Sequence, residues 1–151
     1  METSTFLGME NRVLLKSDET EGAAGVIDIL IQPGAGAPLH TNTREALLWF
    51  VIDGTLNLVT EEGLEQVAAG QASFLPKGHK QTFVNATDDK VQALLVCIPG
   101  GFERFLLELS GKLPADVPAG PPSPDAIQLI DRIGERYGLI QHLDDPASLE
   151  A

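Results

Sequence analysis

Short runs of alternating apolar and polar residues, separated by turns rich in glycine and proline, fill the first hundred residues. The runs predict strands at 12–16, 25–32, 46–52, 56–58, 64–68, 73–75, 81–85 and 91–98. Short strands at such regular spacing are typical of an all-β sandwich or barrel. Asp53-Gly54, which follows the 46–52 run, has the composition of a hairpin turn, and residues 2–5 read as a frayed end.

The period of two also predicts which side chains share a face of the sheet. His40 and Asn42 have the same parity, and so do Leu47 and Trp49. On the later strand Gln81, Phe83 and Asn85 also share one parity. We therefore expect polar and apolar groups from several strands to meet inside the barrel.

After residue 101 the apolar period changes from two to that of a helix. The first helical face consists of Phe102, Phe105, Leu106 and Leu109, and the second of Ile127, Ile130, Ile133 and Tyr137. Ser123 is the predicted N-cap of the second helix, and Pro124 its first residue. A connector with five prolines, residues 113–124, separates the helices.

These patterns predict one domain, with a barrel at 1–100 and helices with a proline-rich link at 101–151. The apolar stripe of the second helix is expected to pack on the barrel or on a partner subunit, and it favours a homodimer. Residues 144–151 read as a frayed tail.

The net charge and the cysteine content restrict the classes of partner that the protein can have. The formal net charge is −12, and such a surface repels phosphate backbones and anionic membranes, so neither nucleic acid nor a membrane is an expected partner. Cys97 is the single cysteine, which argues against disulfides and predicts a buried, inert thiol. The start of the chain lacks a signal-peptide pattern, so we expect a cytoplasmic protein.

Two stretches, residues 33–54 and 70–85, resemble the two sequence motifs of the cupin superfamily. The matching positions are Gly34 or Gly36, His40, Gly54, Gly70, Pro76, Gly78 and Asn85. The resemblance implies an all-β cupin barrel, that is, a double-stranded β-helix or jelly roll, here with a C-terminal helical extension. Residues 100–109 and 135–138 resemble small single-domain cupins of the quercetin-dioxygenase-like group.

In that superfamily three histidines and a glutamate hold one divalent metal. His40 matches the first histidine, whereas Asn42, Leu47 and Gln81 occupy the other three ligand positions. Two neutral amides and one imidazole are a poor ligand set for a transition metal, so we predict no tightly bound metal and no cofactor.

A displaced metal site made of His40, His79 and Glu45 is an alternative. Otherwise Glu45 and His79 are expected to be solvated loop residues at the barrel rim.

The residues expected to line the pocket are His40, Asn42, Leu47, Trp49, Gln81 and Phe83. This lining suits an apolar, planar or polycyclic metabolite with a carbonyl or hydroxyl group. His40 is the candidate acid or base, with Asn42 and Gln81 stabilising a developing enolate or alkoxide. This hypothesis describes a metal-independent isomerase, cyclase or lyase of specialised metabolism.

Three other interpretations stay open. In the first, the protein binds a small molecule without catalysis. In the second, it is a metal-dependent, dioxygenase-like cupin with a non-standard ligand set. In the third, His40 is a core histidine hydrogen-bonded to the two amides.

Overall fold

Two antiparallel β-sheets face each other in the computed structural model, which describes residues 2–120 and 122–143. The strands are β1 (Glu2–Phe6), β2 (Met9–Leu15), β3 (Gly25–Ile31), β4 (His40–Asn42), β5 (Ala46–Asp53), β6 (Thr55–Thr60), β7 (Gly63–Ala68), β8 (Ala72–Leu75), β9 (Lys80–Val84), β10 (Val91–Ile98) and β11 (Leu139–Gln141). One sheet has the order β1-β2-β3-β10-β5-β8 and the other β11-β4-β9-β6-β7. This arrangement is a jelly-roll barrel.

Alternation along the strands produces the core between the sheets. On β5, for example, Leu47, Trp49 and Val51 are at most 2% exposed, whereas Phe50 and Ile52 face outward. The expectation of an all-β barrel with a helical C-terminal extension is confirmed.

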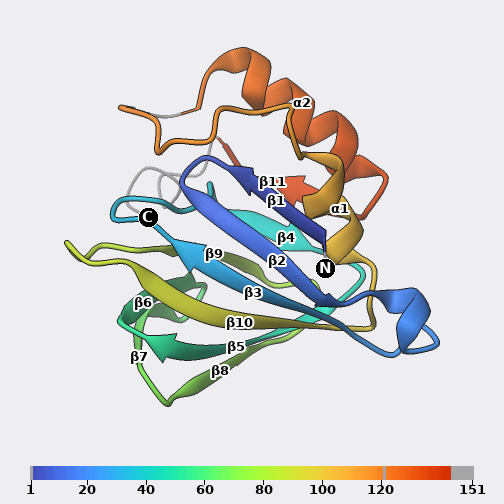
Figure 1. Cartoon of the computed structure of the whole chain (residues 1–151), viewed down its shortest axis with the longest axis horizontal. Helices are drawn as coiled ribbons and strands as arrows, with labels where there is room; N and C mark the ends of the chain where they lie inside the picture. Colours follow the sequence, from blue (N-terminus) through green and yellow to red (C-terminus); the bar gives the residue numbers. More distant parts are fainter. Residues whose placement is uncertain (1, 121, 144–151) are drawn as a thin grey trace.

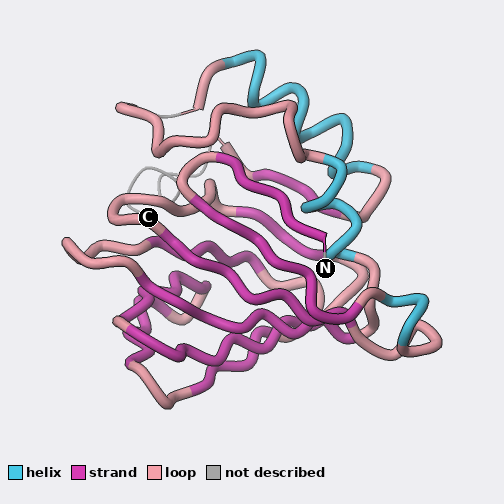
Figure 2. Tube along the Cα trace, viewed as in Figure 1, coloured by secondary structure: helices cyan, strands magenta, loops and turns pink. Residues whose placement is uncertain are grey.

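The helices lie together at one end of the barrel (Figures 1 and 2). They are α1 (Phe102–Glu108) and α2 (Pro124–Glu135), and a 3₁₀ helix at Ser17–Glu19 precedes β3. Both predicted helices are confirmed, and the Ser123 side chain caps α2 by accepting a hydrogen bond from the Ala126 amide at 3.2 Å. In the described part of the chain, no helix is long and apolar enough to span a membrane.

Two local expectations are wrong. Residues 2–5 are not frayed but belong to β1, where Ser4 is buried and donates to the carbonyl of Leu106 at 2.7 Å. Asp53-Gly54 does not close a hairpin, because β5 and β6 lie in different sheets. Gly54 instead forms a corner, where its φ is +88° and a Cβ would lie 2.9 Å from Val91. The predicted tail at 144–151 lies outside the described residues.

A fully buried carboxylate joins α1 to the barrel. Glu103 accepts from the backbone N–H of Ser17 at 2.8 Å and from that of Gly101 at 2.6 Å. Gly25 of β3 lies directly against it, and a Cβ there would be 2.9 Å from the Glu103 carboxyl carbon. This contact leaves room only for glycine.

We predict that Gly25→Ala lowers the free energy of unfolding by about 1–3 kcal/mol, because the two backbone hydrogen bonds prevent the Glu103 carboxylate from moving away. Gly120→Ala is the matched control, since a Cβ at Gly120 meets no atom within 4 Å. Urea unfolding of both variants measures the effect. Equal stability of the two would contradict the packing described here.

Candidate functional site

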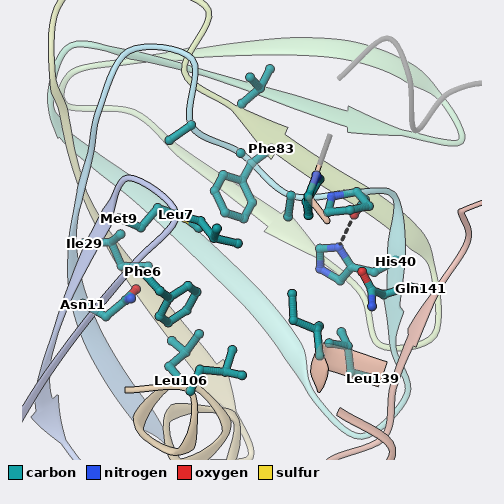
Figure 3. A pocket seen from close by; sticks show the side chains of 18 of the residues that line it. Phe6, Leu7, Met9, Asn11, Ile29, His40, Phe83, Leu106, Leu139 and Gln141 are labelled. Carbon is teal, nitrogen blue, oxygen red and sulfur yellow. Dashed lines mark hydrogen bonds between the residues drawn. The ribbon is translucent and has the colours of Figure 1, made fainter. Parts of the chain in front are cut away.

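A cavity of about 490 Å³ lies between the two sheets, at the end of the barrel that the helices cover. Side chains from both sheets, from α1 and α2 and from the proline-rich segment before α2 form its wall. Figure 3 shows part of this wall, with side chains of both sheets and of α1 labelled. Most of this wall is apolar, and its size is typical of a small-molecule site.

His40 provides the titratable group of the wall. It lies on β4, is 8% exposed, and its Nδ1 is 2.9 Å from the carbonyl oxygen of Pro38 (Figure 3, dashed line). Because a carbonyl only accepts hydrogen bonds, the neutral ring carries its proton on Nδ1. Its Nε2 therefore carries the lone pair of the neutral ring, which is the form a general base requires.

Burial lowers the pKa of His40, and the neighbouring His142 acts in the same direction. The Pro38 carbonyl and the Asn42 side chain act the other way, because both stabilise the protonated ring. The net effect favours neutral His40 at neutral pH.

Gln81 and Gln141 flank His40 on neighbouring strands. His40 pairs with Gln81 across β4 and β9, and with Gln141 across β11 and β4. Residues directly opposite each other share a face of the sheet, so the three side chains form a row on the cavity wall. Figure 3 shows Gln141 beside the His40 ring. We call these three residues the polar row.

Asn42 and Glu45 lie behind this wall. Asn42 is 1% exposed and Glu45 4%. Asn42 Nδ2 donates to Glu45 Oε1 at 2.7 Å, and Gln81 Nε2 donates to Asn42 Oδ1 at 3.4 Å. The expectation that Glu45 is a solvated rim residue is therefore wrong, since its carboxylate is the buried acceptor that Asn42 needs.

The apolar wall contains three residues expected from the sequence. Leu47 and Trp49 of β5 and Phe83 of β9 all line the cavity. The ring centroids of Trp49 and Phe83 are 5.1 Å apart and the ring planes are inclined by 51°, which is a favourable geometry for two aromatic rings. Cys97 is fully buried nearby in β10, where burial raises the pKa of its thiol.

The sequence did not point to two polar residues of the cavity, Gln141 and Asn11. Gln141 comes from β11, whose three residues follow Gly138 and carry only a short alternation. Asn11 lies on β2, and Figure 3 shows it on the other side of the cavity from His40. The parity of Asn11 with Met9 and Val13 was a signal that it points inward.

The donor set does not fit a metal centre. His79 is exposed and does not line the cavity. Within residues 2–120 and 122–143, no three His, Cys, Asp or Glu side chains form a cluster able to hold a metal ion. Leu47 contributes buried apolar volume to the cavity wall, where no metal ligand is provided.

Residues 28–97, which run from β3 to β10, match the sequence family described as Cupin domain. The chain has the fold of a cupin barrel. No curated protein sequence matches the chain.

Solved cupin structures have similar folds. A sugar phosphate isomerase of the cupin superfamily from Silicibacter pomeroyi is 26% identical, with a TM-score of 0.53 over 60% of this chain and 59% of that one. The chain thus spans less than two thirds of that isomerase.

Two further structures share the fold at lower identity. The polyketide cyclase RemF from Streptomyces resistomycificus is 20% identical, with a TM-score of 0.55 over 66% of this chain and 70% of that one. KdgF from a Halomonas species is 12% identical, with a TM-score of 0.60 over 69% and 91%.

We predict that Glu45→Gln changes how stability depends on pH. Burial raises the pKa of Glu45 above its ordinary value of 4.5, so the wild type loses stability as pH rises through that value and beyond. The amide oxygen of glutamine still accepts from Asn42 but does not ionise. The free energy of unfolding of the variant, relative to wild type, should therefore rise between pH 4 and pH 8.

Urea unfolding at pH 4, 5, 6, 7 and 8 gives this difference. Glu135→Gln, at an exposed position of α2, is the control, and its difference from wild type should stay flat. If the difference in free energy of unfolding between Glu45→Gln and wild type also stays constant with pH, ionising Glu45 does not destabilise the folded state.

Proposed function

We propose that this cupin binds an apolar, aromatic or polycyclic metabolite and acts on it without a metal, with His40 as the general base. The reaction class is an isomerisation, cyclisation or elimination that begins with proton abstraction. The observation that carries the proposal is the state of His40. Its neutral ring keeps the Nε2 lone pair beside an apolar cavity of about 490 Å³.

The surroundings of His40 support a proton-accepting role. When Nε2 takes up a proton, the Pro38 carbonyl and Asn42 are already placed to stabilise the imidazolium. Asn42 thus acts on the base, which differs from the role expected from the sequence, where its amide was to stabilise an enolate. The Gln81 nitrogen is likewise held by Asn42 rather than offered to a substrate oxygen.

Neighbouring structures are compatible with this class of chemistry. A sugar phosphate isomerase and a polyketide cyclase share the fold. The degenerate ligand positions, with Asn42, Leu47 and Gln81 where metal-binding cupins have histidine or glutamate, favour a reaction without a metal or another cofactor. We place the protein in specialised metabolism in the cytoplasm.

The test uses 6-hydroxy-2-tetralone, a bicyclic ketone that carries a phenolic hydroxyl and exchangeable protons next to its carbonyl. We predict that the wild type accelerates exchange of these protons in D₂O, followed by NMR. His40→Gln should lower this acceleration by about 10²-fold or more, the usual contribution of a general base. His79→Gln, which changes an exposed histidine, should leave the rate unchanged.

The other interpretations give different results in the same experiment. Binding of the probe without any acceleration by the wild type would identify a non-catalytic binding protein. Acceleration that survives in His40→Gln would remove His40 from the mechanism. One transition metal per chain by elemental analysis, with loss of activity in chelator, would identify a metal-dependent cupin with a non-standard ligand set.

We also propose that the protein is a homodimer, but not through α2. The apolar stripe of α2 packs on its own barrel, where Ile130 and Ile133 are buried. The outer face of the six-stranded sheet offers a better surface. A row of uncharged cross-strand neighbours crosses it: Leu15, Val26, Val96, Leu48 and Phe74.

The size and charge of this face favour a second copy of the chain as its occupant. Strand spacing and rise give roughly 600 Å² for such a sheet face, close to the 800 Å² per partner of a standard interface. Because the chain carries a net charge of −12, two copies associate best around an uncharged row of this kind, beside which Arg12 and Asp28 neutralise each other in an ion pair.

We predict that sedimentation finds a dimer for the wild type and a monomer for Phe74→Lys, because a lysine in this row would be buried without a partner charge. Phe74 is 57% exposed in the single chain, so the variant should fold. Leu64→Lys, at a 61% exposed position in the other sheet, should remain dimeric. A monomeric wild type would exclude this interface.

A further inference from the structure

The hydrogen bonds behind the cavity wall decide which atoms of the polar row face a ligand. Asn42 is the starting point, because its partner Glu45 is a carboxyl group whose oxygen accepts a hydrogen bond at 2.7 Å. An acceptor requires the NH₂ end of the Asn42 amide, so the oxygen end of Asn42 must point the other way. The orientation of this amide is thereby fixed by chemistry.

Asn42 in turn orients Gln81. The Oδ1 of Asn42 faces Gln81 and accepts from its Nε2 at 3.4 Å. The Gln81 nitrogen is thus held against Asn42, and the atom left for the cavity is Oε1. Within the described part of the chain, no group donates a hydrogen bond to this oxygen.

Gln141 is oriented independently and in the same sense. Its Nε2 donates to Oδ1 of Asp131, on α2, at 2.6 Å. A carboxylate oxygen again requires the NH₂ end of the amide, so Oε1 of Gln141 is the atom available on the side of His40 (Figure 3).

His40 completes the pattern. Its Nδ1–H is held by the Pro38 carbonyl, and Nε2 offers a lone pair. Three neighbouring side chains, contributed by β9, β4 and β11, therefore each present an acceptor: Gln81 Oε1, His40 Nε2 and Gln141 Oε1. A polar wall of this kind is satisfied by a ligand that donates hydrogen bonds and not by one that only accepts them.

We propose that the cavity selects aromatic ligands that carry a hydroxyl group, and that Gln141 is a specificity-determining residue of this site. The hydroxyl donates to the polar row, while the ring lies against the wall that contains Trp49 and Phe83. A ketone or an ether in the same place sets its oxygen against a hydrogen-bond acceptor of the protein. Neither acceptor then has a donor, which costs free energy in an apolar cavity. This proposal rests on the proposed function, since it requires that the cavity binds an apolar small molecule.

The test compares 2-naphthol with its methyl ether, 2-methoxynaphthalene, by calorimetry. Binding inside the cavity is checked by NMR through the indole N–H of Trp49, the single tryptophan of the chain. We expect the wild type to bind 2-naphthol at least about tenfold more tightly than the ether, the usual contribution of one hydrogen bond. The ratio of the two Kd values is compared between proteins, which cancels the size difference between the probes.

Two variants report on Gln141. Gln141→Leu removes the acceptor and should reduce the Kd ratio about tenfold, mainly by weakening 2-naphthol. Asp131→Lys leaves Gln141 in place but replaces its acceptor with a donor, so the amide turns and presents its NH₂ end to the cavity. This exposed substitution should shift the preference toward the ether. Gln128→Leu, on an exposed position of α2, is the control and should keep the wild-type ratio.

The outcomes separate this inference from the proposed function. If both probes shift the Trp49 signal with equal Kd, the cavity binds apolar molecules but the preference for a hydroxyl is wrong. If neither probe binds, the proposed binding of aromatic ligands is itself wrong. If Gln141→Leu and Asp131→Lys both keep the wild-type ratio, Gln141 does not determine specificity.

Discussion

A polar side chain buried inside an apolar barrel must find its hydrogen-bond partners within the protein, and here the carboxylate of Glu45 meets that need for Asn42. The rest of the polar side of the cavity depends on this bond. Asn42, once oriented, holds the nitrogen of Gln81 and stabilises the protonated form of His40. One buried carboxylate thus determines how neighbouring groups face the ligand, although it does not line the cavity.

The C-terminal segment is part of the site and not an appendage. It continues the five-stranded sheet through β11, places Gln141 beside His40, and covers the cavity with the apolar side of α2. The spacing of the apolar stripe at 127–137 does not show whether it packs on its own barrel or on a partner subunit. In the structure it packs on its own barrel. A cupin barrel that ended after β10 would leave this face of His40 open to solvent, and the effect of burial on its pKa would be smaller.

Much of the fold follows from local pattern. Alternation predicted most of the strands, and the change of period with Ser123 and Pro124 predicted α2. What depends on distant pairing was not predictable in this way. β1 is polar by composition and becomes a strand because it pairs with β2 and because Ser4 reaches Leu106, 102 residues away. The Asp53-Gly54 turn has hairpin chemistry, yet sheet membership makes it a corner.

The same distinction holds for the site. Parity placed His40, Leu47, Trp49, Gln81 and Phe83 on the inner face, and all five line the cavity. The direction of each amide could not be read from the sequence, because it depends on Glu45 and Asp131, which the chain brings near only when folded. Gln141 was missed since its place beside His40 results from a pairing across 101 residues.

The polar row also constrains the chemistry that His40 can perform. Proton transfer from the ligand to Nε2 creates an imidazolium, which the surrounding carbonyl and amide oxygens stabilise. The same oxygens repel the anion left on the ligand, and the row offers it no oriented N–H of the kind found in an oxyanion hole. The anion must therefore be stabilised by its own structure, through delocalisation over a conjugated ring system. A hydroxyl on an aromatic or enolisable ring meets both requirements, because it donates to the row when neutral and spreads its charge when ionised.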